Sequence, residues 1–122
     1  MVRHARKAPE EPYVPMQGEI VRVGLGSGKG HEPQGRRPFI CLSNALVSRF
    51  ANIALFAPIS TTERRYPLYI PLDRGLETDG VVMLDQLVTL DYTARGATYV
   101  ETVGEAFLDR LLETVKLVFQ KD

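Results

Sequence analysis

The chain has 122 residues and a formal net charge of zero, and 44% of its residues are hydrophobic and 25% charged. These values are ordinary for one globular domain and exclude a disordered chain or a second independent core. No apolar run approaches the ~20 residues that span a bilayer, and the N-terminal stretch lacks the apolar segment of a signal peptide, so we expect a cytoplasmic protein with no membrane partner.

The first 15 residues are predicted to form a flexible tail, and residues 16–122 the folded domain. The tail holds three prolines and three basic residues but few apolar side chains. A stretch of this composition cannot bury a useful face, so it is not expected to contribute to a core.

Short runs rich in β-branched residues follow the tail and are typical of strands. They are Ile20–Val23, Phe39–Leu42, Ile53–Ala57, Leu68–Leu72, Val81–Leu84 and Leu87–Leu90. Because Gly, Pro, Asn and Asp separate them at short spacing, the pattern predicts a small antiparallel β-barrel or sandwich. The single cysteine, Cys41, excludes an internal disulfide and is expected to be buried.

A glycine-rich loop, residues 24–35, joins the first two runs. Its Lys29 is followed by Gly30 where a nucleotide-binding P-loop requires Ser or Thr, so we reject nucleotide binding. A long loop of this kind is expected to form a mobile lid over a groove.

Two helices are expected. Thr102 and Glu105 form a capping-box pattern, which predicts a C-terminal helix beginning there. Apolar residues then recur at helical spacing and predict a buried stripe: Phe107, Leu108, Leu111, Leu112, Val115, Val118 and Phe119. Ser43 and Asn44 are predicted to cap a shorter helix that runs through Arg49.

Few residues could carry chemistry. The only histidines, His4 and His31, have no partner at ligand spacing, so a histidine metal site is disfavoured. No Gly-x-Ser-x-Gly motif is present, so a serine hydrolase is disfavoured too. No metal or cofactor is expected.

The charged side chains are distributed unevenly along the chain. Residues 16–65 carry seven basic and three acidic side chains, whereas residues 66–122 carry five basic and ten acidic ones. This asymmetry permits a basic surface for phosphates on a neutral chain.

Several motifs occur in the order found in one family. They are Gly18–Val21, Lys29–Glu32, Gly35–Asn44, Ala57–Thr61, Tyr66–Pro67, Asp79–Gln86 and Ala94–Thr98. Together they cover residues 17–119 and resemble the MazF/PemK/Kid toxins of type II toxin–antitoxin systems. Three departures stand out: Ser60 replaces the usual Thr, Pro33 interrupts a Glu-Gln pair, and the loop is richer in glycine.

The resemblance implies an SH3-like or CcdB-like β-barrel with a C-terminal helix, acting as a homodimer and inhibited by a MazE-like antitoxin. It implies sequence-specific, ribosome-independent and metal-independent cleavage of single-stranded RNA, including mRNA. In such a reaction the substrate's 2′-hydroxyl attacks the adjacent phosphorus and leaves a 2′,3′-cyclic phosphate and a 5′-hydroxyl.

By position, the resemblance makes Arg37 and Ser60 the catalytic residues. We expect Arg37 to stabilise charge on the phosphate, since a guanidinium stays protonated near neutral pH and is a poor base. Lys29, Arg64 and Arg65 are expected to contact RNA phosphates. The remaining candidate RNA-binding residues are Glu32, Gln34, Thr61 and Gln86.

Two alternatives stay open on the same fold. A CcdB-like gyrase poison would carry its effect in a C-terminal Trp-Gly-Ile segment, but this chain contains no tryptophan and ends Val118–Asp122. An SH3-like interaction domain without catalysis is disfavoured by the presence of both Arg37 and a hydroxyl at position 60.

Overall fold

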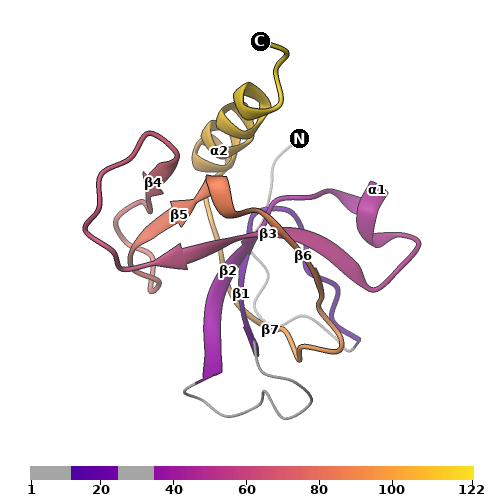
Figure 1. The fold of residues 1–122 in the computed structure, drawn as a ribbon. Coiled ribbons are helices and arrows are strands. Elements are labelled where there is room, and N and C mark those ends of the chain that lie inside the picture. The colour runs from indigo at the N-terminus through magenta and orange to yellow at the C-terminus, as the bar shows by residue number, and fades with distance from the viewer. Residues whose placement is uncertain (1–11, 25–34) are drawn as a thin grey trace.

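A computed structural model of the chain describes residues 12–24 and 35–122 (Figure 1). The predicted tail, apart from residues 12–15, and loop residues 25–34 lie outside the described residues. The elements are β1 (Glu19–Gly24), β2 (Arg36–Cys41), α1 (Ala45–Ser48), β3 (Ile53–Ser60), β4 (Tyr69–Pro71), β5 (Val81–Met83), the 3₁₀ turn η2 (Leu84–Gln86), β6 (Val88–Asp91), β7 (Thr98–Thr102) and α2 (Glu105–Val118).

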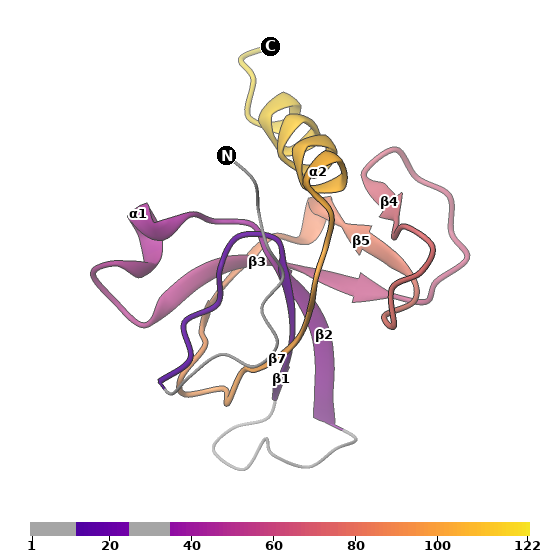
Figure 2. The same cartoon turned by 180° about the vertical axis from the view of Figure 1, so that it is seen from behind.

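Strand β3 organises the antiparallel sheet. Along the sheet the order is β4-β5-β3-β2-β1-β7, and β6 also pairs with β3. The first half of β3 pairs with β6 and its end pairs with β5, so the sheet curls around it into a partly closed barrel. In both views α1 and the β4–β5 hairpin lie at opposite ends of β3 (Figures 1 and 2). The predicted mainly β barrel with a C-terminal helix is confirmed.

The central strands are buried on both faces. Ile20 and Ile40, which are paired across β1 and β2, belong to a core cluster that includes Leu108 and Leu111 of α2. Val21 and Phe39, one position along, belong to a second cluster on the opposite face. Since successive side chains of a strand alternate between faces, the near-continuous apolar runs of these strands follow directly from this double burial.

Helix α2 forms where expected, but its predicted start was wrong. Gly104, not Thr102, is the N-cap, and it makes no side-chain capping bond. Thr102 still belongs to β7, where it pairs with Glu19, and its hydroxyl lies 2.8 Å from that of Tyr99. The pairing with β1 holds the backbone extended up to this point, so tertiary structure overrides the local capping pattern.

The predicted apolar stripe of α2 is buried only in its first half. Phe107, Leu108 and Leu111 are buried, whereas Val118 and Phe119 are exposed, the latter by 74%. The helix extends past the edge of the barrel (Figure 1), and its last turn has no packing partner among the described residues. No helix within the described ranges is both long and apolar enough to cross a membrane.

The short helix α1 confirms the second helix prediction. The side chain of Asn44 accepts a hydrogen bond from the backbone of Leu46 and caps the helix, as its type favours. The neighbouring Ser43 hydroxyl instead accepts from the Leu55 backbone at 2.9 Å, which ties the start of the helix to β3.

Part of the stretch predicted as a tail packs on the barrel. Tyr13 is buried, its ring meets that of Tyr99 edge-on at 6.3 Å, and its hydroxyl donates to Glu19 at 2.8 Å. The backbone N–H of Met16 donates to the same carboxylate at 2.9 Å. Glu19, only 2% exposed, thereby joins residues 13–16 to the start of β1.

Candidate nucleic-acid interface

Two adjacent arginines at the start of β2 differ in their surroundings. Arg36 is a structural residue, because its Nη2 lies 2.8 Å from the carbonyl of Arg22, 2.7 Å from that of Gly96 and 2.9 Å from the hydroxyl of Thr98. Arg37 is exposed and, within the described part of the chain, has no hydrogen-bond or ion-pair partner. Its guanidinium is therefore free to bind an anion.

Ser60 ends β3, where the chain turns away from β5. Its hydroxyl oxygen accepts a hydrogen bond from the Thr62 backbone at 3.2 Å. The hydroxyl of Thr62 does the same for the backbone of Arg64. These successive turns fix the Ser60 oxygen while its proton stays available for donation to a ligand.

A surface cavity of about 350 Å³ brings the predicted catalytic residues together. Its lining residues come from β1, β2, the end of β3 and the turn before β5: Arg22, Arg37, Pro38, Ile59, Ser60, Thr61, Glu77, Thr78 and Asp79. The strand pairing explains the convergence, since β2 lies beside both β1 and β3. Arg37, Ser60 and Thr61, three of the predicted site residues, thus share one cavity.

Six residues of this cavity were not predicted as site residues, and four of them, Arg22 and the 77–79 turn, carry polar side chains. Arg22 could have been found, since it is the outward-facing position between the buried Val21 and Val23. Asp79 begins the Asp79–Gln86 motif, but Glu77 and Thr78 carry no comparable signal, because they reach the cavity only through the folding of the β4–β5 hairpin. Glu77 and Asp79 add two carboxylates to a cavity that also holds the guanidinium groups of Arg22 and Arg37.

Two other predicted residues meet in a separate aromatic cluster. The Arg64 guanidinium lies over the rings of Tyr66 and Tyr69, at 5.1 and 5.7 Å from their centroids. The amide of Gln86 reaches the Tyr69 hydroxyl at 3.3 Å, a long hydrogen bond. The two tyrosines meet edge-on at 5.0 Å. This arrangement offers ring faces and a cation, the groups on which single-stranded bases stack.

The remaining predicted residues are not brought into these two groups. Arg65 is exposed and belongs to neither. Lys29, Glu32 and Gln34, and the predicted lid that contains them, fall outside the described residues. Within residues 12–24 and 35–122, no group of three or more His, Cys, Asp or Glu side chains is placed to hold a metal ion.

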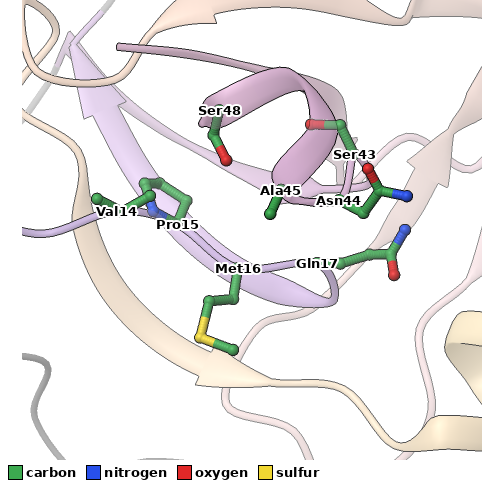
Figure 3. A pocket seen from close by; sticks show the side chains of 8 residues that line it. All are labelled: Val14, Pro15, Met16, Gln17, Ser43, Asn44, Ala45 and Ser48. Carbon is green, nitrogen blue, oxygen red and sulfur yellow. The ribbon is translucent and has the colours of Figure 1, made fainter. Parts of the chain in front are cut away.

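A second cavity of about 260 Å³ lies beside α1 (Figure 3). It is lined by Val14, Pro15, Met16, Gln17, Ser43, Asn44, Ala45 and Ser48. Val14 and Met16 are large apolar side chains that are 42% and 50% exposed, and Leu46 and Phe50 on or just after α1 are exposed still further. This region is a candidate for contact with another protein.

Comparison with known proteins gives one consistent family. Residues 16–119 match the sequence model described as "PemK-like, MazF-like toxin of type II toxin-antitoxin system". The chain is 36% identical over 92 residues to the endoribonuclease toxin MazF of Escherichia coli K12, covering 75% of this chain and 82% of that one. It is 34% identical over 100 residues to the endoribonuclease PemK of Escherichia coli, covering 79% and 75%.

Solved structures agree with the fold. A MazF structure from Deinococcus radiodurans superposes with a TM-score of 0.74 and 27% identity, covering 87% of this chain and 96% of that one. A MazE–MazF structure from the same organism gives a TM-score of 0.75 at 24% identity, covering 89% and 99%.

Proposed function

The chain belongs to the PemK-like, MazF-like toxins of type II toxin–antitoxin systems, and we propose that it cleaves single-stranded RNA at the cavity lined by Arg37 and Ser60. Endoribonuclease activity follows from the family and from its named relatives.

The observation that carries the proposal is the convergence of Arg37, Ser60 and Arg22 on one open cavity. A scissile phosphate needs fixed donors for its two non-bridging oxygens. The Arg37 guanidinium supplies charged N–H donors, and the Ser60 hydroxyl, whose oxygen is already held by Thr62, supplies an O–H donor. Arg22 adds positive charge at the same place.

In the proposed reaction the 2′-oxygen of the substrate attacks the adjacent phosphorus, and the bond from phosphorus to the 5′-oxygen breaks. The 2′-hydroxyl gives up its proton and the departing 5′-oxygen gains one, so the products are a 2′,3′-cyclic phosphate and a 5′-hydroxyl. Negative charge grows on the non-bridging oxygens in the transition state, where Arg37 binds it more tightly than in the ground state. Ser60 aligns the phosphate. The chemistry is proposed to need no metal.

RNA on either side of the cut is proposed to follow the surface from the cavity to the aromatic cluster. Thr61 lies at the cavity and begins the segment that leads to Arg64. Arg64 and Arg65 supply positive charge for phosphates, and the tyrosine rings with Gln86 supply stacking surface and an amide for bases. Lys29, Glu32 and Gln34 are proposed to contact RNA from the loop.

The protein is further proposed to act as a cytoplasmic homodimer and to be inhibited by a cognate MazE-like antitoxin. Large apolar side chains exposed near α1 and at the end of α2 support contacts with protein partners. Light scattering on the purified chain tests the first claim, since a monomer mass at micromolar concentration would contradict it.

Cleavage of defined RNA by the purified protein in EDTA tests the activity and the residue assignment together. We expect the native protein to produce cyclic-phosphate and 5′-hydroxyl ends, and Arg37→Ala to lose activity by about 100-fold or more, as removal of a transition-state donor does. Arg36→Ala is not a suitable control, because Arg36 of β2 binds Arg22 of β1 and Thr98 of β7 and so links three strands. Arg110→Ala, on the exposed face of α2, should keep native activity.

Ser60→Ala removes a neutral donor and the oxygen that binds Thr62. We expect a smaller loss in single-turnover rate, about tenfold, with Ser60→Thr near native because the hydroxyl is retained. Unchanged cleavage by Ser60→Ala, or near-native cleavage by a folded Arg37→Ala, would show that the reaction occurs elsewhere. Gyrase inhibition without RNA cleavage would favour the CcdB-like alternative.

A further inference from the structure

The turn formed by Glu77, Thr78 and Asp79 makes one wall of the candidate cavity, and another element holds it in place. Glu101 on β7 accepts hydrogen bonds from the backbone of Glu77 at 3.0 Å, from the backbone of Thr78 at 2.7 Å and from the hydroxyl of Thr78 at 2.6 Å. Bonds to a charged acceptor are stronger than neutral ones. Glu101 therefore holds the 77–79 turn against strand β7 through three hydrogen bonds.

The other end of the same turn rests directly on the candidate catalytic strand. A Cβ added at Gly80 would lie 2.3 Å from the carbonyl oxygen of Ser60, so the two backbones are in close contact. The carbonyl of Gly80 also accepts from the backbone of Leu72 at 3.0 Å. Residues 77–80 are thus fixed at both ends, by Glu101 and by Ser60.

The wall differs in charge from the rest of the cavity. Glu77 and Asp79 are exposed, and within the described residues neither carboxylate pairs with a basic side chain, whereas Arg22 and Arg37 line the same space. A carboxylate repels an RNA phosphate, so the sugar–phosphate backbone should stay on the arginine side. The bases are neutral, and their N–H groups can donate to the carboxylates.

This chemistry discriminates among bases. Guanine, adenine and cytosine carry an exocyclic amino group that can donate to a carboxylate, and guanine presents two adjacent N–H donors that match both carboxylate oxygens. Uracil has no amino group, and its one N–H on the pairing edge lies between two carbonyl oxygens that a carboxylate repels. A fixed acidic wall therefore favours an amino-bearing base beside the scissile phosphate.

We propose that Glu101 is a positioning residue for base selection, which holds Glu77 and Asp79 so that they accept hydrogen bonds from an amino-bearing base next to the cut. The inference rests on the proposed RNA cleavage and adds to it the element that reads the sequence.

The test uses full-length protein and RNA oligonucleotides that carry A, C, G or U at each nucleotide flanking the cut. Single-turnover cleavage is measured for native protein, Glu101→Ala, Glu101→Gln and the control Glu113→Ala, an exposed residue of α2 that is 75% accessible. Binding of matched 2′-O-methyl oligonucleotides, which cannot be cleaved by this reaction, is measured by fluorescence anisotropy. Melting temperatures establish that each variant is folded.

We expect native protein to prefer an amino-bearing base over uracil by about tenfold at one flanking position, in cleavage and in binding. Glu101→Ala should reduce this preference to about twofold or less, mainly by slowing reaction of the preferred RNA. Glu101→Gln retains one carbonyl acceptor and should restore part of it, and Glu113→Ala should match native protein.

Three results overturn the inference: an unchanged preference in folded Glu101→Ala, an equal loss of rate for all four bases, or a native preference for uracil at both flanking positions. If the native protein cleaves none of the RNAs, the proposed function fails, and the inference fails with it. Cleavage by native protein with an unaltered preference in the variant removes the inference alone.

Discussion

At the scale of single residues, burial controls the titration of Tyr92. Burial raises the pKa of its hydroxyl above the ordinary value of 10.0, and the nearby negative charges of Asp91 and, when ionised, Cys41 raise it further. The folded protein therefore holds this proton more tightly than the unfolded chain. The resulting stability is complete below pH 10 and is lost as the pH rises toward the folded-state pKa.

The prediction is that the free energy of unfolding of native protein falls more steeply above pH 10 than that of Tyr92→Phe, which has no proton to lose. Urea denaturation at a series of pH values from 8 to 11 measures this difference. Parallel pH profiles for the two proteins would contradict it.

Sequence motifs can nominate residues whose position along the chain is informative, but they do not reveal residues whose role depends on tertiary contacts. Arg37 and Ser60 were nominated from ordered motifs, and the fold places both at one cavity. Nothing local distinguishes Glu101 from other strand glutamates, because its role depends on a turn more than 20 residues away in sequence.

At the scale of elements, the turn between β4 and β5 is constrained at Gly80. Gly80 has a φ of +125°, a region that other residues rarely adopt, and it has no space for a side chain beside Ser60. Both constraints act on the segment that lines the cavity.

Gly80→Ala should lower the free energy of unfolding by about 2–4 kcal/mol and also slow RNA cleavage, because Ser60 must shift to relieve the contact. Gly75→Ala is the matched control: its φ is +96°, but nothing lies within 4 Å of the added Cβ. It should cost only about 1 kcal/mol and leave cleavage unchanged. Urea denaturation and single-turnover cleavage measure both effects, and equal losses in the two variants would contradict the steric argument.

The strands that were predicted correctly all contain short runs of apolar or β-branched residues, and double burial accounts for those runs in β1, β2 and β3. Strand β7 was missed. Its Thr98, Tyr99 and Val100 favour a strand, but Glu101 and the expected helix start at Thr102 obscured the signal. Edge strands such as β7 carry weaker patterns because they bury less of each side chain.

At the scale of the whole molecule, the arginines that lie at the cavity and at the aromatic cluster predict how RNA affinity depends on salt concentration. Arg22 and Arg37 at the cavity and Arg64 at the aromatic cluster would each neutralise a phosphate. These three contacts alone contribute about −2 to the slope in a plot of log binding constant against log salt concentration, which is about a 20-fold loss of affinity between 50 and 200 mM salt, and a contact from Arg65 steepens it further.

Anisotropy with uncleavable RNA measures this slope. Arg64→Ala should make it shallower by about 0.7, whereas Arg110→Ala should leave it unchanged. A slope near zero for native protein would show that these arginines do not contact phosphates.

The double burial of β1, β2 and β3 leaves neither face of the central sheet for a ligand. Most side chains of the candidate cavity therefore lie at strand ends or in turns, at the rim of the barrel, and Arg22 and Pro38 are the ones that lie within strands. Exposed side chains at the rim bury little surface, so they can be exchanged at small cost to stability. In the turn before β5 this applies to Glu77 and Asp79, which are exposed, whereas Gly80 and the contacts of Thr78 with Glu101 must be kept. Sequence preference can thus be redesigned at these two positions while the scaffold stays the same.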